Sequence, residues 1–550
     1  MFIDEGAGTF HARPAKMGYV QDERRLGLCV NGSGILSEFA AGNSGRDAFE
    51  DTTHGAKMTE HRPMRAAGTA MLWQAFQMGG VKVLYMIRLL VLAILLTPAD
   101  FGLVAIALAA TNFLQNLTNF GLVPAVVQAE SMDEAKYDAA WTFEMTRSMI
   151  VTSLTIIFAP LIAQIFAEPR AVPIIQILAL RPFIESMTSI KVAALNRNLT
   201  FRPLAFLKIV EAIFNAVISI SLAKFIGVWA MVFGMIGGMI ALVIASYILA
   251  PYRPRILFDW KAVQPLMKFG GWLLVTAVVG MAGNFGLRII ISRQVGAEGL
   301  GLYSLAAQLA FLPSEVASEV VGTVAFPLFA RLQYDLKQAA RAFQAILTSL
   351  MALLYPICAL IIVLSPILVK EILGSKWDGT VPLIQILALV TMIGLLGDST
   401  IPLVKGFGQS YRITQIELVQ SSTLIAMIWL LTSRYGVLAA ALAWLPAIIL
   451  VQILCLYFIW DIFHDPLKDA RKPLLAILSA TIAGGGISAL VISRLQNIPG
   501  LVLASLLAAL VTGSILWISD RRYSLGLFRN IAIAFPQVAA FLKIPNVELE

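Results

Sequence analysis

The chain has 550 residues, of which 58% are hydrophobic and only 13% are charged. An average soluble domain carries about 25% charged residues, so this composition argues against a water-exposed globular protein. The net charge of +8 comes from short basic clusters that separate apolar runs, which is typical of a membrane protein and not of a nucleic-acid-binding groove.

Residues 1–64 are polar, glycine-rich and aperiodic, and they precede the first apolar segment. They contain no apolar core followed by a small-residue cleavage site, so no signal peptide is predicted. Either this extension is disordered, or the true start lies further along the chain, at Met58, Met64 or Met71. We favour the second interpretation and expect no function in this segment.

From residue 70 onward, fourteen apolar segments follow one another, each long enough to cross a bilayer. Lipid-exposed segments must satisfy their own backbone hydrogen bonds, so these segments are predicted to be helices. They cover approximately residues 70–96, 101–127, 140–166, 173–195, 204–226, 228–250, 266–294, 299–329, 342–373, 381–404, 413–433, 436–460, 473–493 and 500–518. The predicted fold is an all-α polytopic membrane protein with about 14 transmembrane helices.

The charges of the loops predict the orientation. The even-numbered loops and the C-terminal tail together carry nineteen lysines and arginines, whereas the opposite loops carry four, which are Arg170, Lys376, Arg434 and Arg494. Short loops rich in lysine and arginine stay in the cytoplasm, so both termini are predicted to be cytoplasmic. The outward loops are too short to hold an external catalytic domain.

An internal repeat divides the chain into two lobes. The segment Val172–Leu180 recurs as Val381–Leu389 with eight of nine residues identical, at an offset of 209, and Phe101-Gly-Leu matches Leu300-Gly-Leu at an offset of 199. Six helices restore the original orientation, so the repeat is parallel and predicts a pseudo-two-fold axis along the membrane normal. Two six-helix lobes facing a central cavity are typical of an alternating-access carrier, here with two additional helices.

This repeat predicts the following boundaries. The polar extension covers 1–64, the N-terminal lobe 65–250, a cytoplasmic linker 251–265, the C-terminal lobe 266–460, two additional helices 461–518, and a cytoplasmic tail 519–550.

Several short motifs, in order along residues 68–460, resemble those of Wzx-like polysaccharide flippases. They are Leu96-Thr-Pro-Ala-Asp-Phe-Gly-Leu103, Asn119-Phe-Gly-Leu122, Ala194–Arg202, Pro251-Tyr-Arg-Pro-Arg255, Gly301-Leu-Tyr-Ser-Leu305, Phe326–Gln333 and Lys376-Trp377. The resemblance implies that the chain is a member of the multidrug/oligosaccharidyl-lipid/polysaccharide exporter superfamily, in its polysaccharide transport branch. Residues 1–64 have no counterpart in this pattern.

The resemblance implies that the protein moves a polyprenyl-diphosphate-linked oligosaccharide from the cytoplasmic to the periplasmic leaflet of the inner membrane, for exopolysaccharide or lipopolysaccharide synthesis. The implied partners are this lipid-linked oligosaccharide, membrane lipids and other polysaccharide-assembly proteins, but no nucleic acid. Two alternatives stay open: a cation-coupled multidrug exporter of the same superfamily, and a membrane polysaccharide polymerase or ligase.

Such an anionic cargo needs positive charge inside the membrane, because an unpaired anion in hydrocarbon is costly. Arg88 and Lys82 in the first segment, and Arg288 in the seventh, have no carboxylate within helical reach. Arginine suits a diphosphate because its planar guanidinium donates to two oxygens at once. We therefore predict that Arg88, Arg288 and Lys82 bind the cargo; an interlobe salt bridge is the alternative role. Glu144 and Arg147, Arg181 and Glu185, and Lys208 and Glu211 are instead spaced to pair on their own helices.

Asn112, Asn116 and Asn119 share one helix face and are candidates to bind sugars, or else to join helices. Glu315 and Glu319 lie four residues apart and repel one another unless a proton, a metal cation or an arginine intervenes. With Asp398, they are predicted to serve coupling or gating, either through Na⁺ or H⁺ or through an ion pair between Arg288 and Glu315.

The chain shows no nucleophile–base pair and no phosphate-binding glycine loop. Its three cysteines and four histidines are scattered and do not have metal-ligand spacing. We therefore expect no catalytic residues, no metal site and no resident cofactor.

Overall fold

The computed structural model describes residues 79–118, 134–197, 201–259, 271–464 and 470–523. All regular structure in these ranges is helical, which confirms the predicted all-helical class. The predictions for residues 1–64, for Asn119 and for the tail beyond residue 523 lie outside the described ranges.

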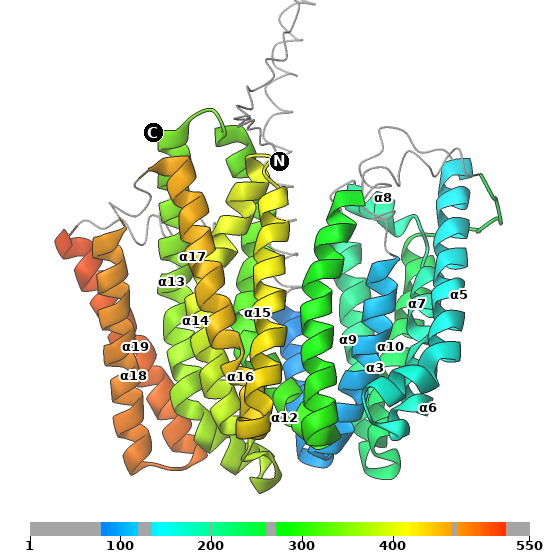
Figure 1. The fold of residues 1–550 in the computed structure, drawn as a ribbon, viewed down its shortest axis with the longest axis horizontal. Coiled ribbons are helices and arrows are strands. Elements are labelled where there is room, and N and C mark those ends of the chain that lie inside the picture. Colours follow the sequence, from blue (N-terminus) through cyan, green and yellow to red (C-terminus); the bar gives the residue numbers. More distant parts are fainter. Residues whose placement is uncertain (1–78, 119–133, 198–200, 260–270, 465–469, 524–550) are drawn as a thin grey trace, which may run out of the picture. The chain divides into compact units, whose positions relative to one another are not determined.

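The N-terminal lobe begins with a helix over residues 79–95. It continues with α3 (Pro98–Leu117), α5 (Glu134–Ile165), α6 (Val172–Leu178), α7 (Leu180–Ser186), α8 (Val192–Arg197), α9 (Phe201–Ile226) and α10 (Val228–Leu249). Helices α3 and α5 to α10 lie together on the right of Figure 1.

The C-terminal lobe begins with α12 (Gly271–Leu332), followed by α13 (Leu336–Ile367), α14 (Thr380–Gly406), α15 (Tyr411–Tyr435), α16 (Ala439–Leu442) and α17 (Trp444–Phe463). The last two helices, α18 (Arg471–Arg494) and α19 (Ile498–Tyr523), pack against α13 through a small cluster that includes Ala352 and Ala480. They lie on the left of Figure 1, beyond the C-terminal lobe.

Eleven helices in the described ranges are long and apolar enough to span a membrane. This count is lower than fourteen because α12 is counted once, although Gly296 bends it with a φ of 84°. The helix at 79–95 and the helices α6 to α8 are also too short to be counted as spans. The number of fourteen spans therefore stays a prediction, whereas the multi-pass helical architecture is confirmed.

The fourth predicted segment, 173–195, differs most from the expectation of one continuous helix. Pro182 in α7 cannot donate a backbone hydrogen bond to the preceding turn, and α6 ends at Leu178. Further along, Ser189 interrupts the helix because its backbone N–H donates to Ser246 Oγ and its hydroxyl donates to the carbonyl of Ala250. Both contacts attach this segment to the end of α10.

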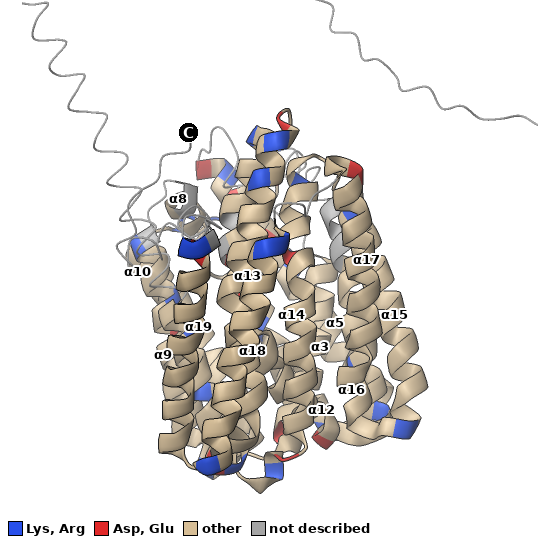
Figure 2. Ribbon diagram, turned by 90° about the vertical axis from the view of Figure 1, so that its left-hand side faces the viewer, with Lys and Arg blue, Asp and Glu red and all other residues tan. Residues whose placement is uncertain are grey.

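Small residues determine how closely the helices approach. A Cβ atom on Gly234 of α10 would lie 1.9 Å from Ser219 Oγ of α9, and one on Gly238 would lie 2.8 Å from the carbonyl oxygen of Glu211. Small residues commonly permit such close packing between helices in membranes. Charged residues are concentrated near the helix ends, and long stretches of the helices carry none (Figure 2).

Candidate functional site

A cavity of about 760 Å³ lies between the two lobes. Its wall in the N-terminal lobe is α3, and its walls in the C-terminal lobe are α12, α14 and α15. Its lining includes Asn112, Asn116, Asn284, Arg288, Lys405, Glu417 and Gln420. A cavity between two repeats is the expected position of a carrier's binding site.

Arg288 is the arginine of this cavity. It is half-buried, and its Nη1 donates one long bond of 3.4 Å to the carbonyl oxygen of Ala105 on α3. Asn112 and Asn116 line the cavity from α3, and Asn116 donates back to the carbonyl of Asn112 at 2.9 Å. The structure therefore brings together three of the predicted cargo-binding residues from opposite lobes.

Four further polar residues of the cavity are absent from the predicted site: Lys405, Glu417, Asn284 and Gln420. Lys405 lies at the end of α14 with its Nζ 5.1 Å from the centre of the Phe326 ring. The sequence does carry a signal for Glu417, because it is an ionisable residue within an apolar segment, and such residues are functional candidates. The amides carry no signal that separates them from ordinary polar residues between helices.

Arg88 lies in the interior of the N-terminal lobe, at 8% exposure. Its Nε donates to Ser219 Oγ at 3.2 Å, and its Nη2 has no partner among the described residues. Arg181 on α7 lies within electrostatic reach of it. Arg88 and Arg288 thus have different surroundings here: one faces the core of its own lobe and the other faces the interlobe cavity.

Lys82 and Glu315 form an ion pair of 2.9 Å between the helix at 79–95 and α12. Glu315 therefore pairs with Lys82 and not with Arg288, which corrects one of the alternatives given above. The partner comes from the other lobe, and nothing in local sequence spacing could reveal it. Glu319, one turn further, is exposed.

The same-helix pairs form in two of three cases. Arg147 pairs with Glu144, and Lys208 with Glu211. The third expectation is wrong, because Glu185 accepts a hydrogen bond from Gln115 Nε2 at 3.2 Å in place of a contact with Arg181.

Asp398 lines a second cavity of about 400 Å³ within the C-terminal lobe. It accepts a hydrogen bond of 2.7 Å from Ser314. Gln452 lines the same cavity at 8% exposure, and neither atom of its amide has a partner in the described part of the chain. Glu315 also lines this cavity, so two of the three predicted coupling carboxylates meet there.

The two lobes are joined at the end of the helices that the charge bias places outside. Lys376 Nζ, on the turn before α14, donates to the carbonyl oxygens of Ile94 and Leu96 at 2.7 Å each. Trp377 Nε1 donates to the carbonyl oxygen of Ala93 at 2.8 Å. These bonds satisfy carbonyl groups at the end of a helix, which have no partner within that helix.

The equivalent segments of the other lobe make the reciprocal contact. Ser292 donates to the carbonyl of Phe166 at 2.7 Å, and the carboxylate of Glu168 accepts the backbone N–H of Ala297 at 3.1 Å. The offset of 199 relates residues 93–96 to 292–295, and the offset of 209 relates 165–168 to 374–377. We call these two sets of contacts, together, the outer latch.

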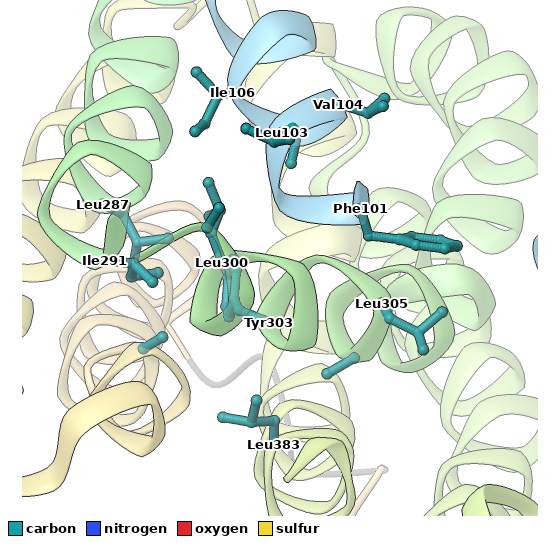
Figure 3. Packing of buried hydrophobic residues seen from close by; sticks show 14 of the residues in the cluster. Phe101, Leu103, Val104, Ile106, Leu287, Ile291, Leu300, Tyr303, Leu305 and Leu383 are labelled. Carbon is teal, nitrogen blue, oxygen red and sulfur yellow. The ribbon is translucent and has the colours of Figure 1, made fainter. Parts of the chain in front are cut away.

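Apolar packing reinforces the outer latch. Phe101, near the start of α3, contacts Trp377 edge-on with 5.2 Å between ring centres. Figure 3 shows the start of α3 beside the turns of α12 that carry Leu300 and Tyr303, with Leu287 and Ile291 before the bend. One apolar cluster contains residues of both lobes here, so the lobes are in contact at this end. The cavity extends from Arg288 to the opposite end of α14, where Lys405 lines it.

Comparisons with known proteins agree with this architecture. Residues 91–382 match the family described as polysaccharide biosynthesis protein. The succinoglycan biosynthesis transport protein ExoT of Rhizobium meliloti (strain 1021) is 25% identical over 456 residues, covering 81% of this chain and 90% of that protein. The lipopolysaccharide biosynthesis protein WzxC of Escherichia coli (strain K12) is 21% identical over 329 residues, covering 59% of this chain and 67% of that protein.

Among solved structures, the lipid II flippase MurJ in an inward closed conformation superposes with a TM-score of 0.67, at 16% identity, over 82% of this chain and 99% of MurJ. An inward-facing multidrug transporter of the MATE family superposes with a TM-score of 0.57, at 14% identity, over 74% of this chain and 99% of that chain. These likenesses establish the fold. The family match covers more than half of the sequence, and the chain therefore belongs to the polysaccharide biosynthesis protein family.

Proposed function

We propose that the protein is a flippase that moves a polyprenyl-diphosphate-linked oligosaccharide from the cytoplasmic to the periplasmic leaflet of the inner membrane, with both termini in the cytoplasm. The observation that carries this proposal is the interlobe cavity, which holds Arg288, Lys405 and several amides. The names of the relatives, which are a succinoglycan transport protein and a lipopolysaccharide biosynthesis protein, support the same cargo class.

The cavity matches the chemistry of this cargo. A diphosphate needs cations that replace its water shell, and Arg288 has one long hydrogen bond to give up. A sugar needs donors and acceptors, which Asn112, Asn116 and Gln420 supply. The polyprenyl chain stays in lipid, because moving it into water would expose its apolar surface.

Alternating access follows from the outer latch. With the outer end closed, the cargo enters from the cytoplasmic side; opening the latch and closing the inner end then releases it outward. The ion pair between Lys82 and Glu315 also joins the lobes, and it can separate in this movement. Arg88, whose Nη2 has no partner among the described residues, supplies a further cation beside Arg288 and Lys405 once the lobes rearrange.

We further propose that the second cavity takes part in coupling. Asp398, Glu315 and the amide of Gln452, which has no partner in the part of the chain that the structure describes, offer oxygen atoms to Na⁺, or a carboxylate to H⁺. Glu319 lies one turn along the same helix and extends this acidic stripe toward the helix end.

The multidrug exporter is the second candidate, favoured by the superposition on a MATE transporter and by Glu417 in the main cavity. Arg288 and Lys405 in that cavity disfavour a cationic drug. A polymerase or ligase receives less support, because the relatives named above are transport and biosynthesis proteins and the chain offers no long outward loop.

Reconstituted vesicles distinguish these functions. The full chain is placed in liposomes with a fluorescent polyprenyl-diphosphate oligosaccharide, and a membrane-impermeant quencher reports the labelled sugar on the outer surface. We expect movement between leaflets in vesicles that contain the protein, and none in empty vesicles. Efflux of a cationic dye without movement of the lipid would favour the exporter; cleavage or elongation of the sugar would favour the enzyme.

A further inference from the structure

Residues 251–259, which follow α10, run beside the start of α5. Asp138 on α5 is 7% exposed, and its Oδ1 accepts hydrogen bonds from Tyr252 Oη at 2.5 Å and from the backbone N–H of Arg255 at 3.3 Å. One turn further along α5, Thr142 Oγ1 accepts the backbone N–H of Leu257 at 3.0 Å. Burial and the bond to Asp138 raise the pKa of Tyr252, so its hydroxyl stays a donor at neutral pH. Side chains of α5 therefore hold this segment in a defined position.

A cavity of about 430 Å³ opens beside this segment, lined by Glu134, Asp138, Lys191, Tyr252, Arg253 and Arg255. Its acidic groups are already engaged: Glu134 pairs with Lys191 at 2.8 Å, and Asp138 accepts the two bonds above. In the described ranges no carboxylate pairs with Arg253 or Arg255, and both side chains are exposed. Both arginines line this one cavity, so their guanidinium groups can reach the same ligand.

Apolar side chains follow directly. Ile256 is 74% exposed and Phe258 is 77% exposed, at the membrane end that the charge bias places in the cytoplasm. Paired guanidinium groups suit phosphate oxygens. Adjacent exposed aliphatic and aromatic side chains suit the boundary between lipid headgroups and acyl chains.

We propose that Arg253 and Arg255, held on α5 by Asp138 and Thr142, form a binding site for the phosphodiester of an anionic membrane phospholipid. This site is separate from the interlobe cavity and lies on the segment that connects the lobes. Lipid is the source of the phosphate because Ile256 and Phe258 have no role toward a free ion. The site anchors the connecting segment to the cytoplasmic leaflet.

Binding to purified full-length protein in detergent tests this site, with dioctanoyl phosphatidylglycerol as the probe and dioctanoyl phosphatidylcholine and inorganic phosphate as comparisons. We expect saturable binding of phosphatidylglycerol that is about 30-fold weaker in Arg253→Gln/Arg255→Gln, since each basic residue near an anionic surface contributes about fivefold. The matched control is Arg331→Gln/Arg341→Gln, which removes two exposed arginines from the same membrane face. It should bind as the native chain does.

A second variant separates a built site from general attraction. Thr142→Val leaves the net charge unchanged but removes the bond to Leu257 N–H, so it should weaken lipid binding several-fold while the thermal unfolding midpoint stays near the native value. Two outcomes would show that bulk charge alone attracts the lipid and would overturn the proposal. One is an equal loss of lipid affinity in the two double arginine variants, and the other is native lipid affinity in Thr142→Val. Equal binding of phosphatidylcholine would overturn it too, as would displacement of the lipid by an equal concentration of inorganic phosphate.

Discussion

Gly102 of the N-terminal lobe lies directly against the backbone of Ala297 in the C-terminal lobe: a Cβ atom on Gly102 would lie 1.8 Å from the carbonyl oxygen of Ala297. The repeat generates the reciprocal contact, because a Cβ on Gly301 would lie 1.7 Å from the carbonyl oxygen of Pro98. The offset of 199 converts one pair into the other. The lobes therefore meet at the outer latch as two equivalent surfaces, as a pseudo-two-fold axis requires.

This contact predicts that Gly102→Ala prevents the outer end from closing. The new methyl group meets a backbone oxygen that cannot rotate away, and such overpacking costs about 1–3 kcal/mol. The open fraction should then rise about five- to 150-fold. The reporter is Ser304→Cys, at a buried position, in a chain whose own cysteines are replaced by alanine. A membrane-impermeant maleimide added from outside labels this cysteine only when the outer end opens.

Gly322→Ala is the matched control for this experiment. It lies on the same helix, α12, and a Cβ there would meet nothing within 4 Å. Labelling at the native rate in both alanine variants would show that the Gly102 contact does not keep the outer end closed.

The polar part of the outer latch gives a second prediction. Lys376→Met removes two hydrogen bonds to carbonyl oxygens, each worth about 1 kcal/mol. Maleimide labelling of the Ser304→Cys reporter should therefore increase about fivefold or more. Lys370 is the control. It lies just after the end of α13, is exposed, and makes no hydrogen bond among the described residues, so Lys370→Met should leave labelling unchanged. Equal labelling of the two methionine variants would contradict the assignment.

The ion pair between Lys82 and Glu315 gives a third prediction. Because the pair is partly exposed, its coupling energy in a double-mutant cycle should lie at about 0.2–1 kcal/mol. Glu315→Gln should slow transport while protein abundance stays near native, and the exchange Lys82→Glu/Glu315→Lys should recover part of the rate. Glu319→Gln is the comparison. Similar slowing in both glutamine variants would favour a cation held between Glu315 and Glu319. A native transport rate in Glu315→Gln would exclude both the ion pair and the cation site as parts of the transport cycle.

The sequence predicted the features that depend on hydrophobicity and repetition. Within the described residues most apolar segments coincide with helices, although 173–195 is divided into α6, α7 and α8. The offset of 199 relates Pro98 and Gly102 to Ala297 and Gly301, which form the reciprocal contacts between the lobes. Hydrophobic length requires a helix in lipid, whatever its neighbours are. Residue spacing also found the pairs Glu144–Arg147 and Lys208–Glu211, since one helix face brings these groups together.

Contacts between lobes could not be predicted in this way. The partner of Lys82 is 233 residues away, and whether Arg88 faces the cavity or its own lobe depends on the rotation of a helix. The hydrogen bond that the backbone N–H of Ala297 donates to the carboxylate of Glu168 likewise joins residues of opposite lobes. Ionisable residues within spans could be selected as candidates, but their partners come from tertiary packing.

The most direct test of the central claim measures flipping of a labelled polyprenyl-diphosphate oligosaccharide by variants of Arg288 in proteoliposomes. Arg288→Ala removes a charge-assisted contact worth about 1.5–3 kcal/mol, so the flipping rate should fall at least about tenfold. Arg288→Lys should recover only part, because an ammonium lacks the bidentate fork. Arg331→Ala, an exposed arginine outside the cavity lining, should keep the native rate. A native rate in Arg288→Ala would contradict the account, because the cavity would then move its cargo without the cation assigned to the diphosphate.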